Sequence, residues 1–186
     1  MLRLNDQQRQ DFIDAVAQAR GRHDVRRAVH AIYNEFASEV ARRQPKCQAS
    51  GRCCHFDRFG HRLFLTAAEL AVFLDGRAAA AKDGSVASQR RDASTIPLPV
   101  IARDPSSDRG ACRFLVDNRC SVHPIRPFGC RVFFCDPSAE GWQQAQYERF
   151  HADLRRLHAS AAIPYFYVEW REALAILDAT GSVGSD

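Results

Sequence analysis

The sequence lacks several features that would assign it quickly to a class. It has no long apolar run of the kind that spans a membrane, and its first twenty residues lack the apolar stretch and cleavage site of a secretory signal. Only two residues, Lys46 and Lys82, are lysine, and no basic run is interleaved with aromatic residues, which argues against a nucleic-acid ligand. These absences predict a cytoplasmic protein with no membrane segment.

Signatures of familiar catalytic sites are missing as well. The sequence has no glycine-rich nucleotide loop, no Ser/His/Asp grouping at an informative spacing and no Cys-x-x-Cys redox pair. The composition is that of an ordinary globular chain, with 186 residues, 46% apolar and 26% charged. This length favours a single domain over residues 1–186. The net charge of +4 comes mainly from scattered arginines, which predicts a solvated basic surface.

The cysteines, by contrast, are concentrated in one part of the chain. All seven fall between residues 47 and 135. Converging thiolates are soft ligands that select zinc, copper(I) or an iron–sulfur cluster. In a reducing compartment clustered cysteines bind metal or do redox chemistry more often than they form disulfides, and an odd number would leave one unpaired. The predicted metal ligands are Cys47, Cys53, Cys54, Cys112, Cys120, Cys130 and Cys135.

Apolar periodicity and turn residues predict the local structure. Asn5 is expected to cap the first helix, with Gln8 reaching back to it, and Pro45 ends the second. The turn signal at 117–119 predicts a hairpin that places Cys112 near Cys120. The expected helices cover 5–20, 24–43, 66–74, 139–159 and 168–177, and the expected extended segments cover 61–65, 96–101 and 112–116.

Two further stretches are expected to be irregular. Residues 77–94 are rich in alanine, serine and charge, and are predicted to form a mobile loop. Pro124, Pro127 and Gly129 predict backbone that stays out of helix as far as Cys130. The fold class is therefore predicted to be α+β, predominantly α-helical, with a small antiparallel β element. A cysteine-rich metal-binding core over 47–135 is expected between flanking helices in 5–44 and 139–178.

Cysteine spacing alone leaves the metal open. Zinc fingers and ribbons use pairs separated by two to four residues, and only Cys130 and Cys135 come close. The spacing of ferredoxins is absent. Gly51 suggests a tight turn through which backbone approaches a bound ion or cluster. Arg126 and Arg131 flank Cys130, and two interpretations stay open: they offset the charge of the thiolates, or they pair with carboxylates.

Two stretches resemble the YkgJ family, whose members are described as zinc- or iron-chelating. The string CQASGRCC at 47–54 is similar to the family's CxxCxxCC signature. The run CRFL at 112–115, followed by CSVHPIRPFGCR at 120–131, resembles its C-x-F-L and C-x-I-Y-x-x-R-P-x-x-C-R patterns. The match lies within 47–135, about half of the chain. Ser50 stands where the family has its second cysteine, and a hydroxyl is a poor ligand for a soft metal.

The resemblance implies a cofactor and leaves the role open. Some relatives, such as flagellin lysine methylases, are described as iron–sulfur proteins, so the cofactor is expected to be an iron–sulfur cluster, [4Fe–4S] first, or zinc. The expected function is a metal-binding protein with a structural, redox or metal-handling role, with or without a protein partner. The alternative is an iron–sulfur-dependent enzyme, an oxidoreductase or a lysine-methylase-like protein, that needs a partner or substrate.

Overall fold

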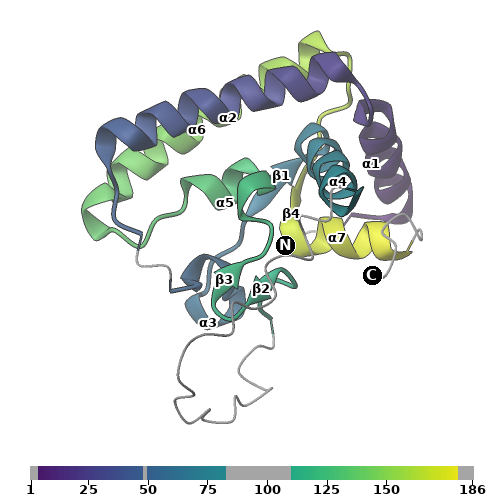
Figure 1. The fold of residues 1–186 in the computed structure, drawn as a ribbon. Coiled ribbons are helices and arrows are strands. Elements are labelled where there is room, and N and C mark those ends of the chain that lie inside the picture. The colour runs from purple at the N-terminus through teal and green to yellow at the C-terminus, as the bar shows by residue number, and fades with distance from the viewer. Residues whose placement is uncertain (1–3, 48–49, 83–109, 180–186) are drawn as a thin grey trace.

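The computed structural model describes residues 4–47, 50–82 and 110–179 (Figure 1). Most of them are helical, and two small antiparallel sheets complete an α+β fold, as predicted. Within these ranges no helix is long and apolar enough to cross a membrane. The helices are α1 (Asp6–Ala19), α2 (His23–Arg43), α3 (Phe56–Phe59), α4 (Ala67–Lys82), α5 (Phe128–Val132), α6 (Glu140–Ser160) and α7 (Trp170–Ala179). The strands are β1 (Phe64–Thr66), β2 (Leu115–Val116), β3 (Arg119–Cys120) and β4 (Tyr167–Glu169).

The helices outside the cysteine-rich segment form as their sequences predict. The Asn5 side chain accepts a hydrogen bond from the N–H of Gln8, whose own side chain accepts from the N–H of Asn5, so the predicted capping box is confirmed. Helix α2 ends at Arg43, and its C-cap residue Gln44 has a left-handed φ of 51° directly before Pro45. Helices α2 and α6 run side by side in opposite directions (Figure 1).

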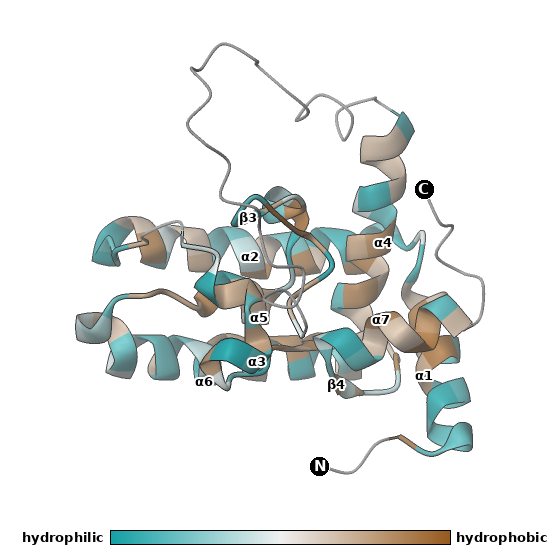
Figure 2. Cartoon of the chain, turned by 90° about the horizontal axis from the view of Figure 1, so that it is seen from below, coloured by the Kyte–Doolittle hydropathy of each residue, from teal (hydrophilic) through white to brown (hydrophobic). Residues whose placement is uncertain are grey.

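The core lies between this helix pair and the group formed by α1, α4 and α7. Phe36 of α2 packs against Phe128 and Phe150, with ring centroids 5.1 and 5.5 Å apart. Phe73 of α4 meets Trp170 of α7 edge to face at 5.0 Å. Figure 2 shows hydrophobic residues concentrated in α4 and α7. Their burial anchors the elements on which the cysteine segments rest.

Helix α4 is longer than predicted. It continues through Gly76 to Lys82, whereas the sequence suggested an end near residue 74. A Cβ at Gly76 would lie 3.2 Å from Ile125 Cγ2, so this glycine permits a close contact instead of ending the helix. The prediction of a loop is therefore wrong for residues 77–82. The rest of that predicted loop, 83–94, and the extended segment predicted at 96–101 lie outside the described residues.

The sheet formed by β1 and β4 was only half predicted. Leu65 pairs with Val168, and the N–H of Trp170 donates to the carbonyl of Leu63 at 2.8 Å. The last helix was expected from residue 168, but α7 begins at Trp170, because residues 167–169 complete this sheet. The pairing brings Trp170 next to the cysteine-rich segment.

The prediction of non-helical backbone up to Cys130 is wrong. Pro127 precedes the first turn of α5, where a missing N–H costs nothing, and the short helix then carries Cys130. A Cβ at Gly129 would lie 2.6 Å from the carbonyl oxygen of Phe64. The glycine is therefore required for α5 to pack against β1, rather than for a break in the helix.

Candidate metal centre

The first cysteine segment folds against the hairpin of the second. Gly51 has a left-handed φ of 70°, and a 3₁₀ turn over Arg52–Cys54 follows it directly. A Cβ at Gly51 would lie 3.0 Å from the carbonyl oxygen of Asn118. The predicted tight turn is thus present, but the backbone that it approaches is that of the hairpin. The N–H of Cys112 donates to the carbonyl of Cys54 at 2.7 Å, and this bond joins the two segments.

The hairpin itself is confirmed. Leu115 pairs with Cys120, and the two loop residues, Asp117 and Asn118, have φ values of 49° and 59°. Positive φ at both positions is the mark of a type I′ turn, which aspartate and asparagine tolerate better than most residues. The hairpin holds Cys120 at its base, on the side where Cys112 begins the segment, so the predicted proximity of these two cysteines is met.

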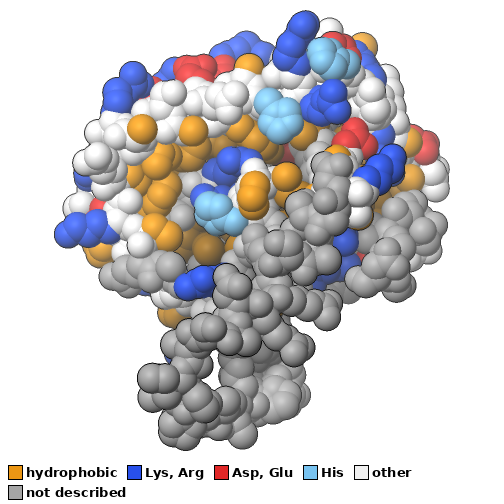
Figure 3. Space-filling model, viewed as in Figure 1, with side chains coloured by type: hydrophobic (Ala, Val, Ile, Leu, Met, Phe, Trp, Pro, Cys, Tyr) orange, Lys and Arg blue, Asp and Glu red, His pale blue; other side chains and the backbone are white. Residues whose placement is uncertain are grey.

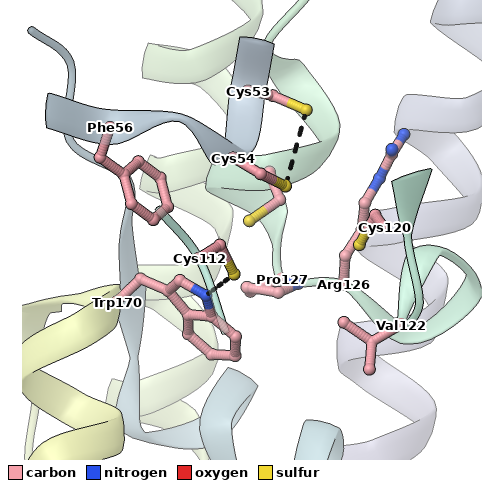
Figure 4. A pocket seen from close by; sticks show the side chains of 10 residues that line it. Cys53, Cys54, Phe56, Cys112, Cys120, Val122, Arg126, Pro127 and Trp170 are labelled. Atoms are coloured by element: carbon pink, nitrogen blue, oxygen red, sulfur yellow. Dashed lines mark hydrogen bonds between the residues drawn. The ribbon is translucent and has the colours of Figure 1, made fainter. Parts of the chain in front are cut away.

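Five cysteines from three separate segments line one pocket (Figure 4). The cavity between them has a volume of about 10 Å³, roughly enough for one water molecule. Trp170 closes one side, and its indole Nε1–H donates to Cys112 Sγ at 3.3 Å. The lining residues are Cys53, Cys54, Cys112, Cys120, Cys130, Phe56, Val122, Arg126, Pro127 and Trp170.

The thiols share this pocket without converging on one point. Cys53 Sγ and Cys54 Sγ are 4.0 Å apart. In the part of the chain that the structure describes, no group of three or more His, Cys, Asp or Glu side chains is arranged to hold a metal ion. The pocket therefore collects soft donors, and metal binding would require their side chains to turn toward a common centre.

Mutual hydrogen bonds give these thiols unequal acidities. Cys54 shares its thiol with three neighbours, and these contacts raise its own pKa. Hydrogen bonding with Cys54, whose single S–H can serve one neighbour at a time, lowers the pKa of Cys53 to about 6 and that of Cys112 to about 7, and it also lowers the pKa of Cys120. Burial raises the pKa of Cys130. The pocket thus mixes thiolate character with a retained thiol proton.

The structure separates the roles of the two arginines that flank Cys130. Arg126 lines the pocket, and its charge helps to lower the pKa of Cys53 and Cys120, which supports the charge-offset interpretation. Arg131 builds the loop instead: it donates to the carbonyls of Arg126 and Pro124 at 2.8 and 2.7 Å. Its guanidinium also lies 4.3 Å from the ring centroid of Tyr33.

The other two predicted ligands lie outside the pocket lining. Cys47 is exposed, and Cys135 is half-buried beside Ser50, whose Oγ is 3.7 Å from the Cys135 sulfur. Ser50 therefore stands away from the five pocket thiols. Lys46 donates its N–H to Asp136 at 3.0 Å, which holds the two chain stretches together. A cysteine at position 50 would lie next to Cys135.

Trp170 was not recognised as a site residue from the sequence. The one signal in the sequence was that a buried indole N–H needs a hydrogen-bond acceptor. The acceptor is Cys112, which the sequence does not reveal, because the pairing of β1 with β4 brings Trp170 and Cys112 together.

On the face shown in Figure 3, Lys and Arg side chains stand at several separate places, as the scattered arginines predict.

Comparisons with known proteins give no further guide to the site. No protein-family profile, curated protein or solved structure matches this chain. The arguments for function therefore come from the pocket and from the sequence motifs.

Proposed function

We propose that this protein binds a metal centre through thiolates of the five-cysteine pocket, an iron–sulfur cluster first and zinc second. The observation that carries the proposal is the meeting of cysteines from the turn at 52–54, the hairpin at 112–120 and helix α5 in one lining. Single cysteines often pack as small hydrophobic residues, but five in one lining is more than such packing requires. Soft donors in this number suit zinc or iron.

The residues fit such a centre after modest side-chain movement. A change of one χ1 rotamer moves a cysteine Sγ by about 3 Å, which is enough to turn neighbouring thiols toward one point. The backbone that carries them is held by the bond between Cys112 and Cys54 and by the hairpin. The Nε of Arg126 is buried and has no hydrogen-bond partner among the described residues, which suits a negatively charged sulfur centre beside it.

Both metals have a specific observation in their favour. The 4.0 Å between Cys53 Sγ and Cys54 Sγ is close to the ~3.8 Å expected for two thiolates that bind one zinc ion tetrahedrally. The number of thiols favours a cluster, which also brings inorganic sulfide and requires the side chains to move outward. A bound cluster would supply one-electron chemistry, and a bound zinc ion would supply cross-linking of the three segments.

The motifs and the chemistry of the site support the same proposal. The resemblance to the YkgJ family covers all five pocket cysteines. Free thiols need a reducing compartment to remain metal ligands, which agrees with a cytoplasmic location. We propose a structural, redox or metal-handling role for the centre. The residues would bind the metal as thiolates, while Phe56, Val122 and Pro127 exclude water from it.

Metal and sulfide analysis of anaerobically purified protein tests the proposal. We expect either iron with acid-labile sulfide and broad visible absorption, or stoichiometric zinc in a colourless protein. Cys54→Ser should abolish binding, because Cys54 contacts three other thiols. Cys135→Ser, outside the pocket, is the matched control and should retain the metal. Wild-type protein with neither metal would refute the proposal, and a Cys54→Ser variant with a full complement would exclude Cys54 from the ligands.

A further inference from the structure

Arg126 has an unusual environment for a charged side chain. Its Nε is buried and has no hydrogen-bond acceptor among the described residues. A guanidinium carries five N–H donors and no acceptor, and a buried donor without a partner costs about 1–3 kcal/mol, more when it is charged. The Nε–H of Arg126 therefore needs a hydrogen-bond acceptor that the described residues do not supply.

The surroundings of Arg126 contain sulfur rather than carboxylate. Among the described residues, five cysteines line the pocket and no Asp or Glu does. Figure 4 shows the Arg126 side chain beside Cys120, extending toward the end of the pocket where Cys53 lies. The carbonyl of Arg126 is held by Arg131 at 2.8 Å, so the backbone that aims the side chain is fixed. The Arg126 side chain thus lies along the edge of a group of atoms that become anionic when they bind metal.

A second donor already shows this kind of contact. Trp170 donates Nε1–H to Cys112 Sγ at 3.3 Å. N–H donors to ligand sulfurs are a principal means by which proteins set the charge and the affinity of thiolate centres. Trp170 donates to Cys112, and Arg126 lies in the same lining as the other four cysteines. Thiolates around a divalent ion leave a net negative charge, which the half-buried guanidinium of Arg126 would offset.

We propose that Arg126 is a positioning residue of the metal centre: its Nε–H donates to a sulfur of the loaded centre and its charge compensates that centre. This inference rests on the proposed function, since it assumes that the pocket thiols bind metal. It also assigns distinct tasks to Arg126 and Arg131. Arg131 already donates to the carbonyls of Pro124 and Arg126, and its guanidinium lies over the ring of Tyr33.

Titration of reduced, metal-free protein with Co²⁺ and displacement by Zn²⁺ tests the inference. Co²⁺ reports thiolate ligation through its charge-transfer absorption, and the displacement gives the Zn²⁺ affinity. We expect Arg126→Gln to weaken Zn²⁺ binding by about 10- to 100-fold, the usual effect of losing such a partner. The charge-transfer band should also move to lower energy, because a thiolate that loses an N–H donor holds its electrons less tightly.

Two further variants make the result specific. Arg126→Lys retains the charge and an N–H donor, so it should recover most of the affinity and the band position. Arg119→Gln removes the same charge next to Cys120 from an exposed position, where solvent screens it. We expect that control to bind Zn²⁺ within about threefold of wild type.

The outcomes separate this inference from the proposed function. Wild-type protein that binds neither Co²⁺ nor Zn²⁺ and carries no iron overturns both. Wild-type protein that binds metal while Arg126→Gln matches it in affinity and spectrum overturns only the role of Arg126. A loss of affinity in Arg126→Gln with an unchanged band, not restored by Arg126→Lys, indicates a merely structural effect and likewise overturns that role.

Discussion

Glu69 accepts a hydrogen bond from the backbone N–H of Phe128 at 2.7 Å, and this bond links the buried start of α4 to the helix that carries Cys130. The same carboxylate accepts from the Tyr33 hydroxyl and from the N–H of Thr66, both at 2.9 Å. Burial raises its pKa, although the three donors favour the ionised form. One carboxylate therefore fixes the first residue of α5.

Replacing Glu69 should destabilise the fold. In Glu69→Gln the new amide N–H₂ faces at least one of the three donors, and we expect the free energy of unfolding to fall by about 1–3 kcal/mol. Tyr33→Phe removes one donor and should cost about 1 kcal/mol. Urea denaturation measures both. Equal stability of Glu69→Gln and wild type would contradict the role that we assign to this carboxylate.

His158 should make stability depend on pH. It is 1% exposed, its Nε2 accepts from the N–H of Ala68 at 3.5 Å, and its Nδ1–H donates to the carbonyls of Ile163 and Pro164. Burial lowers its pKa. The unfolded chain therefore binds a proton at a higher pH than the folded chain, so stability falls as pH drops below about 6.5.

The measurement compares wild type with His158→Asn, which keeps a donor near Nδ1 and cannot take up the proton. We expect the unfolding free energy of wild type to fall more steeply between pH 7 and pH 5 than that of the variant. The excess slope is at most about 1.4 kcal/mol per pH unit, because a single proton is involved. Parallel curves for the two proteins would exclude His158 as the source.

A pair of glycine substitutions tests the packing of α5. Gly129→Ala places a methyl group against the Phe64 carbonyl, and we expect a loss of about 1–3 kcal/mol together with a reduced metal content. Gly141 of α6 has nothing within 4 Å of an added Cβ, so Gly141→Ala should stabilise by about 0.5–1 kcal/mol. Thermal unfolding gives both values. A neutral Gly129→Ala substitution would show that the contact with β1 relaxes easily.

The two tryptophans provide an optical test of metal loading. Trp170 donates to Cys112 inside the pocket, whereas Trp142 stacks on Phe36, 6.1 Å away, within the α2–α6 pair. Co²⁺ quenches a nearby indole, so its addition to the Trp142→Phe protein, which keeps only Trp170, should reduce fluorescence strongly. The Trp170→Phe protein should respond weakly. Equal responses would place the metal away from the cysteine pocket.

Features decided by neighbouring residues were predictable from the sequence. The cap at Asn5 and the turn at 117–118 depend on contacts across a few residues, and both form as expected. Features decided by distant packing were not. Strand β4 exists because β1 is there to pair with it, and α5 forms because Gly129 fits against Phe64. Local patterns carry no information about such partners.

The same distinction applies to the site. Clustering and chemistry pointed to all seven cysteines, and the structure brings five of them into one lining. Cys47 and Cys135 belong to the same sequence pattern but to another place in the fold. Whether they bind metal stays a prediction, and the Cys135→Ser control addresses one of them. Trp170 entered the site through strand pairing, which spacing does not encode.

The contact between Ser50 and Cys135 has a consequence for how such a protein can change over time. A mutation that exchanges serine and cysteine at position 50 alters a single local pair and leaves the five clustered thiols untouched. A thiol at position 50 can thus be gained or lost independently of the pocket cysteines, with little loss of stability for the rest of the fold. A Ser50→Cys substitution would therefore create a second sulfur pair, with Cys135, apart from the five pocket thiols.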